Sequence, residues 1–189
     1  MFLEHKYTID ELMNACRDGS RKAQEGLYKM LAPKMLGVCM RYATDKMEAE
    51  DMLQNGFIKV FTKLADYRGE GSFEGWVRRV MVHTSIEYYR KHHKMMQIVD
   101  IDTPGIEPSV DPLAASNLGV KDLLALIQQL SPGYRMVFNL YAIEGYSHKE
   151  IGETMGISEG ASKSQLSRAR TILKEQIFKM EGKRYENVG

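Results

Sequence analysis

The sequence predicts an all-α protein with two small helical domains, an acidic proline-containing linker between them, and a helix-turn-helix in the C-terminal domain. Apolar residues recur at intervals of three and four, and helix-capping residues precede these runs. No segment shows the alternating pattern of a strand between hairpin turns. Three of the five prolines, Pro104, Pro108 and Pro112, fall in one stretch, through which no helix can run.

The formal net charge of +1 averages over three unlike segments. Residues 1–96 carry 16 basic and 13 acidic side chains, residues 97–117 carry no basic and four acidic ones, and residues 118–189 carry ten and eight. We therefore predict a domain over 1–96, a linker over 97–117 and a domain over 118–189. Both domains are mildly basic, which is compatible with nucleic-acid binding although the whole chain is nearly neutral.

The composition excludes several classes of protein. Of the 189 residues, 43% are hydrophobic and 27% charged, unlike a disordered chain or a collagen-like repeat. Cys16 and Cys39 have neither C-x-x-C spacing nor neighbouring metal ligands, and we interpret them as reduced thiols. The sequence shows no signal peptide and no apolar run of the ~20 residues that a membrane span needs, so we expect a cytoplasmic protein.

Cap signals place the helices of the first domain. Thr8 and Glu11 have the spacing of a capping box, and Asp45 and Glu48 repeat it before a second amphipathic run. Ser72 is expected to open another helix. Together these signals predict about four helices before the linker.

Similar signals place the helices of the second domain. Residues 120–130 form a short amphipathic segment, and Ser131 and Pro132 have the order of an N-cap and a first helical residue. Ser147 and Glu150 form another capping box. We expect about four helices after the linker as well.

The segment 147–175 predicts a helix-turn-helix. Its first helix ends at Met155, Gly156 supplies the left-handed residue that terminates it, and Ser158 caps the next helix. Gly152 lies where two crossing helices need a small side chain. A short helix, a glycine-containing turn and a longer helix are typical of DNA-binding modules.

Two stripes divide the second helix of this motif. Leu166, Ala169, Leu173 and Ile177 form the apolar stripe. The opposite stripe, which we expect to hold no carboxylate, supplies the candidate DNA contacts: Lys163, Ser164, Ser167, Arg168, Arg170, Thr171 and Lys174. Lys163 and Arg168 suit base edges, and the last three residues suit phosphates. The alternative is an ordinary solvated helix face.

The first domain offers two further surfaces. Asp51, Gln54 and Asn55 form an acidic and polar face, which would either complement the helix dipole or bind a protein. The helix after Ser72 mixes aromatic residues with cations, a combination that suits unpaired bases, although we assign most of Trp76 to packing. Its candidate contacts are Arg78, Arg79, His83, Arg90 and Lys91. His83 and Glu87 lack a third ligand, so no metal or other cofactor is expected.

These motifs resemble the sigma-70 family of RNA polymerase sigma factors, in its extracytoplasmic-function (ECF) group. Residues of about 20–94 resemble region 2, where EDMLQNGFIKVFTKL and FEGWVRRVMVHT are similar to D-x-x-Q-x-x-F-x-K and F-x-x-W-x-x-R. Residues of about 120–178 resemble region 4, with LSPGYRMVFNL, SHKEIG and KSQLSRAR as the similar motifs. Ser162 stands where the family commonly has Val, and we expect looser packing beneath the helix there.

The resemblance implies a non-catalytic subunit that directs core polymerase to promoters and assists DNA melting. It implies that Asp51 and Gln54, to which we add Asn55, dock on the clamp helices of beta-prime, with the flap of beta as a second contact. Arg78, Arg79, His83 and a loop around 85–91 would capture the melted minus-ten element. Lys163, Ser164, Ser167 and Arg168 would read the minus-thirty-five element. The group also implies an anti-sigma partner.

Two other functions compete with this interpretation. A helix-turn-helix regulator with an N-terminal sensor or interaction domain would explain 147–175 and leave the basic, aromatic helix of the first domain unassigned. An enzyme is disfavoured, because the sequence shows no nucleophile elbow, phosphate-binding loop or metal triad.

Overall fold

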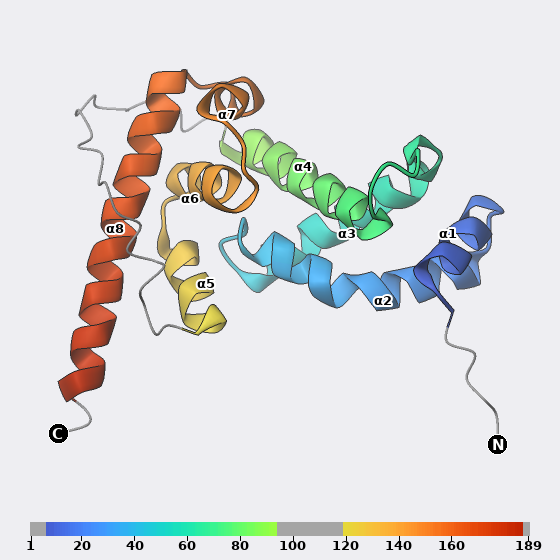
Figure 1. The fold of residues 1–189 in the computed structure, drawn as a ribbon, viewed down its shortest axis with the longest axis horizontal. Coiled ribbons are helices and arrows are strands. Elements are labelled where there is room, and N and C mark those ends of the chain that lie inside the picture. The colour runs from blue at the N-terminus through green and yellow to red at the C-terminus, as the bar shows by residue number, and fades with distance from the viewer. Residues whose placement is uncertain (1–6, 94–118, 187–189) are drawn as a thin grey trace. The chain divides into compact units, whose positions relative to one another are not determined.

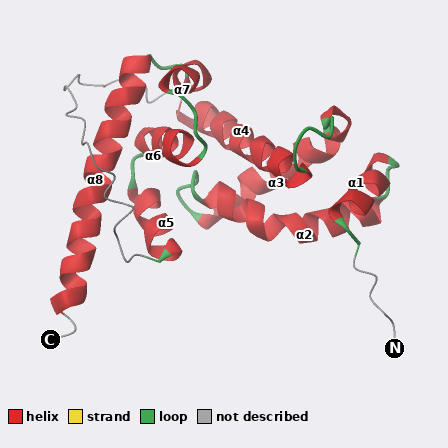
Figure 2. Cartoon of the chain, in the orientation of Figure 1, coloured by secondary structure: helices red, strands yellow, loops and turns green. Residues whose placement is uncertain are grey.

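The computed structural model describes residues 7–93 and 119–186. Both ranges consist of helices and loops, without a strand, which confirms the all-α prediction (Figure 2). Four α-helices precede residue 94 and four follow residue 118, as expected. None of the helices in these ranges combines the length and the apolar character needed to cross a bilayer.

The described residues fall into two compact units. The first comprises Met1–Cys39 and Lys46–Ser85, and the second comprises Met40–Asp45 and Ile86–Gly189. The predicted linker, 97–117, lies outside the described residues, and the predicted domain boundaries stay predictions.

The first unit contains α1 (Ile9–Arg17), α2 (Arg21–Met40), which ends at the unit boundary, α3 (Lys46–Thr62) and a short 3-10 turn η1 (Leu64–Asp66) (Figure 1). It also contains the first part of α4 (Phe73–His93), whose residues from Ile86 onward are grouped with the second unit. The Thr8 hydroxyl accepts a hydrogen bond from Glu11 N at 3.2 Å, and Thr8 N donates to the Glu11 carboxylate at 2.7 Å. The Ser72 hydroxyl accepts from Gly75 N at 3.1 Å. The caps at Thr8 and Ser72 are therefore confirmed, and the predicted Asp45–Glu48 capping box stays a prediction.

Close packing and burial define the core of this unit. A Cβ on Gly56 of α3 would lie within 3 Å of the Met81 thioether of α4, so the absence of a side chain permits the contact. Cys16 and Cys39 are buried and unbridged, as predicted for reduced thiols. Burial raises the pKa of the Cys16 thiol, because the thiolate loses its hydration.

The second unit contains α5 (Val120–Gln129), α6 (Pro132–Phe138), α7 (His148–Met155) and α8 (Glu159–Glu186), and the three shorter helices contact α8 (Figure 1). Ser131 precedes α6 and Pro132 lies in its first turn, as predicted, but the Ser131 side chain makes no capping bond. Arg135 is buried and donates from Nη1 to the Gln128 carbonyl at 2.7 Å, which fixes the junction of α5 and α6.

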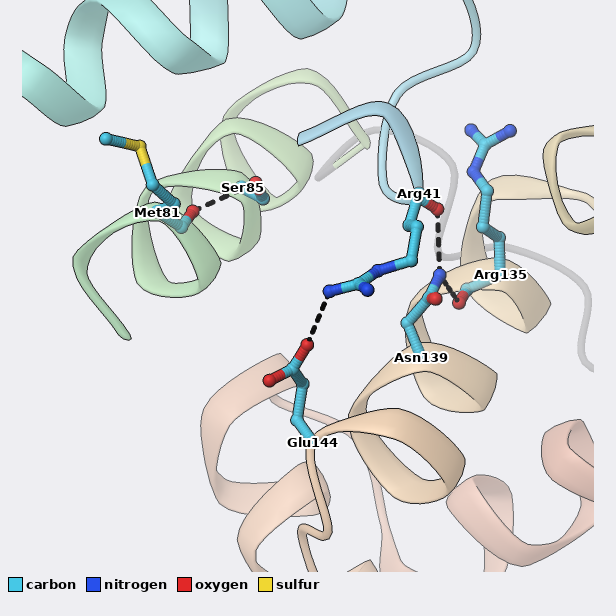
Figure 3. A network of polar contacts seen from close by, with 6 residues as sticks. All are labelled: Arg41, Met81, Ser85, Arg135, Asn139 and Glu144. Carbon is cyan, nitrogen blue, oxygen red and sulfur yellow. Dashed lines mark hydrogen bonds and ion pairs between the residues drawn. The ribbon is translucent and has the colours of Figure 1, made fainter. Parts of the chain in front are cut away.

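A π-helical turn, η3 (Asn139–Ile143), follows α6 and was not predicted. The fully buried Asn139 amide donates to the carbonyls of Arg135 and Arg41, both at 2.8 Å (Figure 3). Arg41 also pairs with Glu144 at 3.0 Å (Figure 3). These contacts account for the grouping of Met40–Asp45 with the second unit, and nothing in the local sequence indicates them.

The predicted helix-turn-helix is present in α7 and α8. The Ser147 hydroxyl accepts from Glu150 N at 3.2 Å, and Ser147 N donates to the Glu150 carboxylate at 2.8 Å. The backbone N–H and the hydroxyl of Ser147 both donate hydrogen bonds to the Glu150 carboxylate, and these bonds hold the pKa of that carboxyl below its usual range. Gly156 has the left-handed φ of 73°, and the Ser158 hydroxyl accepts from Ala161 N at 3.0 Å. All three cap predictions in this motif are confirmed.

Gly152 allows α7 to approach the turn before α8. A Cβ at this position would lie 2.9 Å from the Ile157 carbonyl oxygen, a backbone atom that cannot rotate away. Two glycines thus shape the motif in different ways: Gly156 supplies a backbone conformation, and Gly152 supplies space.

We predict that Gly152→Ala lowers the free energy of unfolding by about 1–2 kcal/mol, because the added methyl displaces the turn. Urea unfolding of the full chain, followed by circular dichroism, measures the change. Gly160→Ala is the matched control, since its Cβ would meet only Ser158 Oγ at 3.9 Å. The control should be neutral or slightly stabilising. Equal stability of the two variants would contradict the assigned role of Gly152.

Candidate nucleic-acid interface

One side of α8 is buried against the other helices of the second unit. Leu166, Ala169, Leu173 and Ile177 are each at most 5% exposed. This confirms the predicted apolar stripe.

The seven predicted DNA contacts lie outside this buried stripe. Lys163, Thr171 and Lys174 are exposed, and the other four are half-buried: Ser164, Ser167, Arg168 and Arg170. The expectation of a surface without carboxylates is wrong. Glu159 pairs with Lys163 at 2.9 Å, and the exposed Glu175 follows Thr171 by four residues, which places it on the same face.

The Glu159–Lys163 pair changes the electrostatics at the start of α8. The hydrogen bond and positive charge of Lys163 hold the pKa of the Glu159 carboxyl below its usual range. The two side chains remain more than half exposed, so water screens their attraction. The attraction between Glu159 and Lys163 is therefore weak.

Two arginines of α8 contact aromatic residues from earlier in the chain. Arg168 Nη1 donates to the Tyr134 hydroxyl at 3.3 Å. The Arg170 guanidinium lies 5.7 Å from the ring centre of Tyr141, which stacks on His148 at 4.5 Å. Sequence reasoning missed Tyr134 and Tyr141, because no local spacing relates them to α8.

Ser162 does not loosen the packing in the expected way. Its side chain is fully buried, and a hydrogen bond of 2.9 Å joins its Oγ to His148 Nδ1. A polar contact between α7 and α8 thus stands where we expected a packing defect.

The structure separates the candidates on α4. Arg79, His83, Arg90 and Lys91 are exposed; Arg79 and His83 lie one turn apart on the same side of the helix, and Arg90 and Lys91 are adjacent residues in its last turns. Arg78 is half-buried and lies about 100° around the helix from Arg79.

The expected loop around 85–91 is wrong. This segment is the continuation of α4, and the buried Ser85 donates to the Met81 carbonyl at 3.0 Å (Figure 3). The physical reason is that residues 76–93 contain no glycine or proline to interrupt the helix.

An aromatic cluster lies at the start of α4. Phe73 is buried and stacks on the half-buried Trp76 at 5.6 Å, and Tyr67 lies 5.2 and 5.7 Å from these two rings. The Tyr67 hydroxyl donates to the Gly71 carbonyl at 2.7 Å. The cluster therefore packs, as expected for Trp76, and its half-buried members Tyr67 and Trp76 remain partly accessible to solvent.

The acidic and polar face of α3 is exposed at each predicted residue. Asp51, Gln54 and Asn55 are all exposed, although the Asn55 amide donates to its own helix at the Asp51 carbonyl. Two large apolar side chains flank this face: Met47 is 72% exposed and Ile58 is 60% exposed. Sequence reasoning missed both, although their spacing from Asp51, four and seven residues, was a usable signal.

No cluster of three or more His, Cys, Asp or Glu side chains with metal-binding geometry occurs among the described residues. The candidate surfaces are thus one helix face each on α3, α4 and α8. Their chemistry is that of binding through charge, hydrogen bonds and aromatic rings.

Two family models match this chain. Residues 27–95 match the family model "Sigma-70 region 2", and residues 121–173 match "Sigma-70, region 4". The chain belongs to the sigma-70 family. It is a sigma factor of the ECF group, a non-enzymatic protein that directs RNA polymerase to promoters. Because the first domain matches region 2, the alternative of a helix-turn-helix regulator with an N-terminal sensor domain is wrong.

Several relatives of this sigma factor carry ECF or sigma-factor names. The chain is 29% identical to ECF RNA polymerase sigma factor SigE of Mycolicibacterium smegmatis, over 81% of this chain and 61% of that protein. It is 28% identical to RNA polymerase sigma factor CarQ of Myxococcus xanthus, over 89% and 97%. Among solved structures, the sigma factor RpoE of Bartonella quintana, crystallised with the anti-sigma factor NepR, aligns with a TM-score of 0.47 at 22% identity, over 78% of this chain and 92% of that chain.

We predict that Ser162→Ala lowers the free energy of unfolding by about 1 kcal/mol, because His148 loses its buried partner. Urea unfolding of the full sigma factor measures the difference. Ser164→Ala is the matched control, since its hydroxyl bonds only the Ala161 carbonyl within α8. If Ser164→Ala lowers the free energy of unfolding as much as Ser162→Ala does, the bond between Ser162 and His148 does not stabilise the fold.

Proposed function

We propose that three helix faces divide the work of promoter recognition. In this proposal α8 reads the minus-thirty-five element, α4 binds the unpaired minus-ten element, and α3 docks on the clamp helices of the beta-prime subunit. The flap of beta would hold the second unit. The proposed site of action is the cytoplasm, where the polymerase transcribes.

The observation that carries the assignment of α8 is its position as the outward-facing second helix of a capped helix-turn-helix. In such motifs the second helix enters the major groove and its first turns approach base edges. Lys163 and Arg168 have the donors that pair with guanine, and Ser164 and Ser167 can bond to several bases. Arg170, Thr171 and Lys174 lie further along and suit the phosphates that set the register.

The proposal for α4 rests on four exposed side chains, Arg79, His83, Arg90 and Lys91. Cations along a helix can follow a phosphate backbone, and aromatic rings can stack on separated bases at about 1–3 kcal/mol per base. These contacts would offset part of the base pairing that melting removes. Arg78 stays in the proposal as a candidate, but its half-buried side chain is less available.

The proposal for α3 rests on an exposed patch of Met47, Asp51, Gln54 and Ile58. Protein interfaces often combine a small apolar centre with polar residues that fix orientation. An isolated helix-dipole effect explains an acid in the first turn but not two large exposed apolar residues beside it. Asn55, whose amide bonds its own helix, would contribute through its remaining groups.

Regulation by an anti-sigma factor is part of the proposal on the ground of the ECF group alone. The described residues do not identify such a partner. Direct isolation from cells with the sigma factor as bait would do so.

We predict that Ile58→Ser weakens binding to core polymerase at least tenfold, because a buried aliphatic side chain contributes about 1.5–3 kcal/mol. Met30→Ser is the matched control, since Met30 is also an exposed apolar residue, on α2. Titration of labelled sigma factor with core polymerase gives both dissociation constants. Equal weakening by the two substitutions would place the docking surface elsewhere.

We predict different effects of Arg168→Ala and Lys174→Ala on transcription by the holoenzyme from a library of minus-thirty-five sequences. Arg168→Ala should remove the preference at one or two base pairs, by about 1–3 kcal/mol. Lys174→Ala should weaken all sequences alike and reduce the salt dependence of binding by roughly one ion. A uniform loss with Arg168→Ala would assign Arg168 to phosphate instead.

A further inference from the structure

Tyr134 lies outside the helix-turn-helix yet contacts its second helix. It belongs to α6, and its hydroxyl accepts a hydrogen bond from Arg168 Nη1 at 3.3 Å. The two residues are 34 positions apart in the chain. This contact concerns the arginine that the proposed function assigns to base reading, and the inference below rests on that assignment.

The backbone that carries Tyr134 is held firmly. On one side, Gly133 brings α6 so close to α8 that an added Cβ would lie 3.3 Å from Gln165 Oε1. On the other side, Arg135, Met136 and Val137 are all at most 2% exposed. A side chain attached to such an element keeps its position better than one on a loop.

The other cations at the start of α8 are held differently. Lys163 pairs with Glu159 of its own helix, at a surface where water screens the pair. Arg170 stacks on the ring of Tyr141 and is not tied by that contact to a hydrogen-bonding direction. Arg168 has a directional bond to a different, tightly packed helix.

Direction matters for arginine because it reads guanine with two parallel hydrogen bonds. The flexible side chain loses conformational entropy when it adopts the required plane, and a partner that already restricts the plane reduces that loss. The guanidinium has five N–H donors and guanine recognition uses two of them, so a bond at Nη1 is compatible with base reading.

We propose that Tyr134 is a positioning residue that sets the base selectivity of Arg168. Its hydroxyl holds the guanidinium in the orientation that pairs with guanine in the minus-thirty-five element. The side chain itself need not touch DNA. Base selectivity of this sigma factor thus depends on a residue outside the motif that reads the sequence.

The test uses holoenzyme with the full chain and a library of single base changes across the minus-thirty-five element. Tyr134→Phe removes the hydroxyl and keeps the packed ring. At the base pairs whose preference Arg168→Ala removes, Tyr134→Phe should reduce selectivity about two- to tenfold, the effect of one typical hydrogen bond. Selectivity at the other positions should stay unchanged. Tyr28→Phe, which removes an exposed phenol hydroxyl on α2, should match the wild type.

The outcomes separate this inference from the function on which it rests. Unchanged selectivity in Tyr134→Phe, with selectivity lost in Arg168→Ala, overturns the role of Tyr134 alone. An equal loss at every position also overturns it, because that pattern indicates a structural role. If Arg168→Ala loses no selectivity, Arg168 does not read bases and both proposals fall. In the Arg168→Ala background, Tyr134→Phe should have no further effect.

Discussion

The close approach of α7 to the turn before α8 is the constraint on which the proposed DNA-binding surface of α8 depends. Gly152 meets the Ile157 carbonyl without a side chain, and Gly156 takes the left-handed conformation that ends α7. Ser158 then starts α8 with its hydroxyl on Ala161 N. Because this turn fixes the angle between α7 and α8, the apolar stripe of α8 faces the core and the candidate DNA contacts lie outside it. A displaced turn would rotate every candidate contact of α8 together.

Three cations on α8 have partners within the protein. Glu159 bonds Lys163, Tyr134 bonds Arg168, and Tyr141 lies under Arg170. Such partners lower the entropy that a long side chain loses on binding. They also neutralise or screen charge, so the nearly neutral chain keeps modest attraction for DNA in general. This arrangement suits a sigma factor, whose useful contacts form when polymerase supplies the rest of the complex.

Polar contacts at long sequence separation hold the second unit in ways that its apolar pattern does not suggest. Asn139 bonds two backbone carbonyls from a π-helical turn, and Ser162 bonds His148 between α7 and α8. Buried polar groups need partners, because desolvation without a hydrogen bond costs about 1–3 kcal/mol. Once such partners are in place, they specify one geometry more sharply than apolar contacts of similar size.

Local sequence patterns predicted most of the helices and caps and the buried stripe of α8, because capping boxes and amphipathic stripes involve residues three or four positions apart. The Thr8 and Ser147 caps and the Gly156 conformation followed from such local rules. The tertiary structure decided which apolar residues stay outside, as Met47 and Ile58 do, and which distant residues meet, as Tyr134 and Arg168 do. Those contacts depend on how whole helices pack, and no short-range spacing encodes that packing.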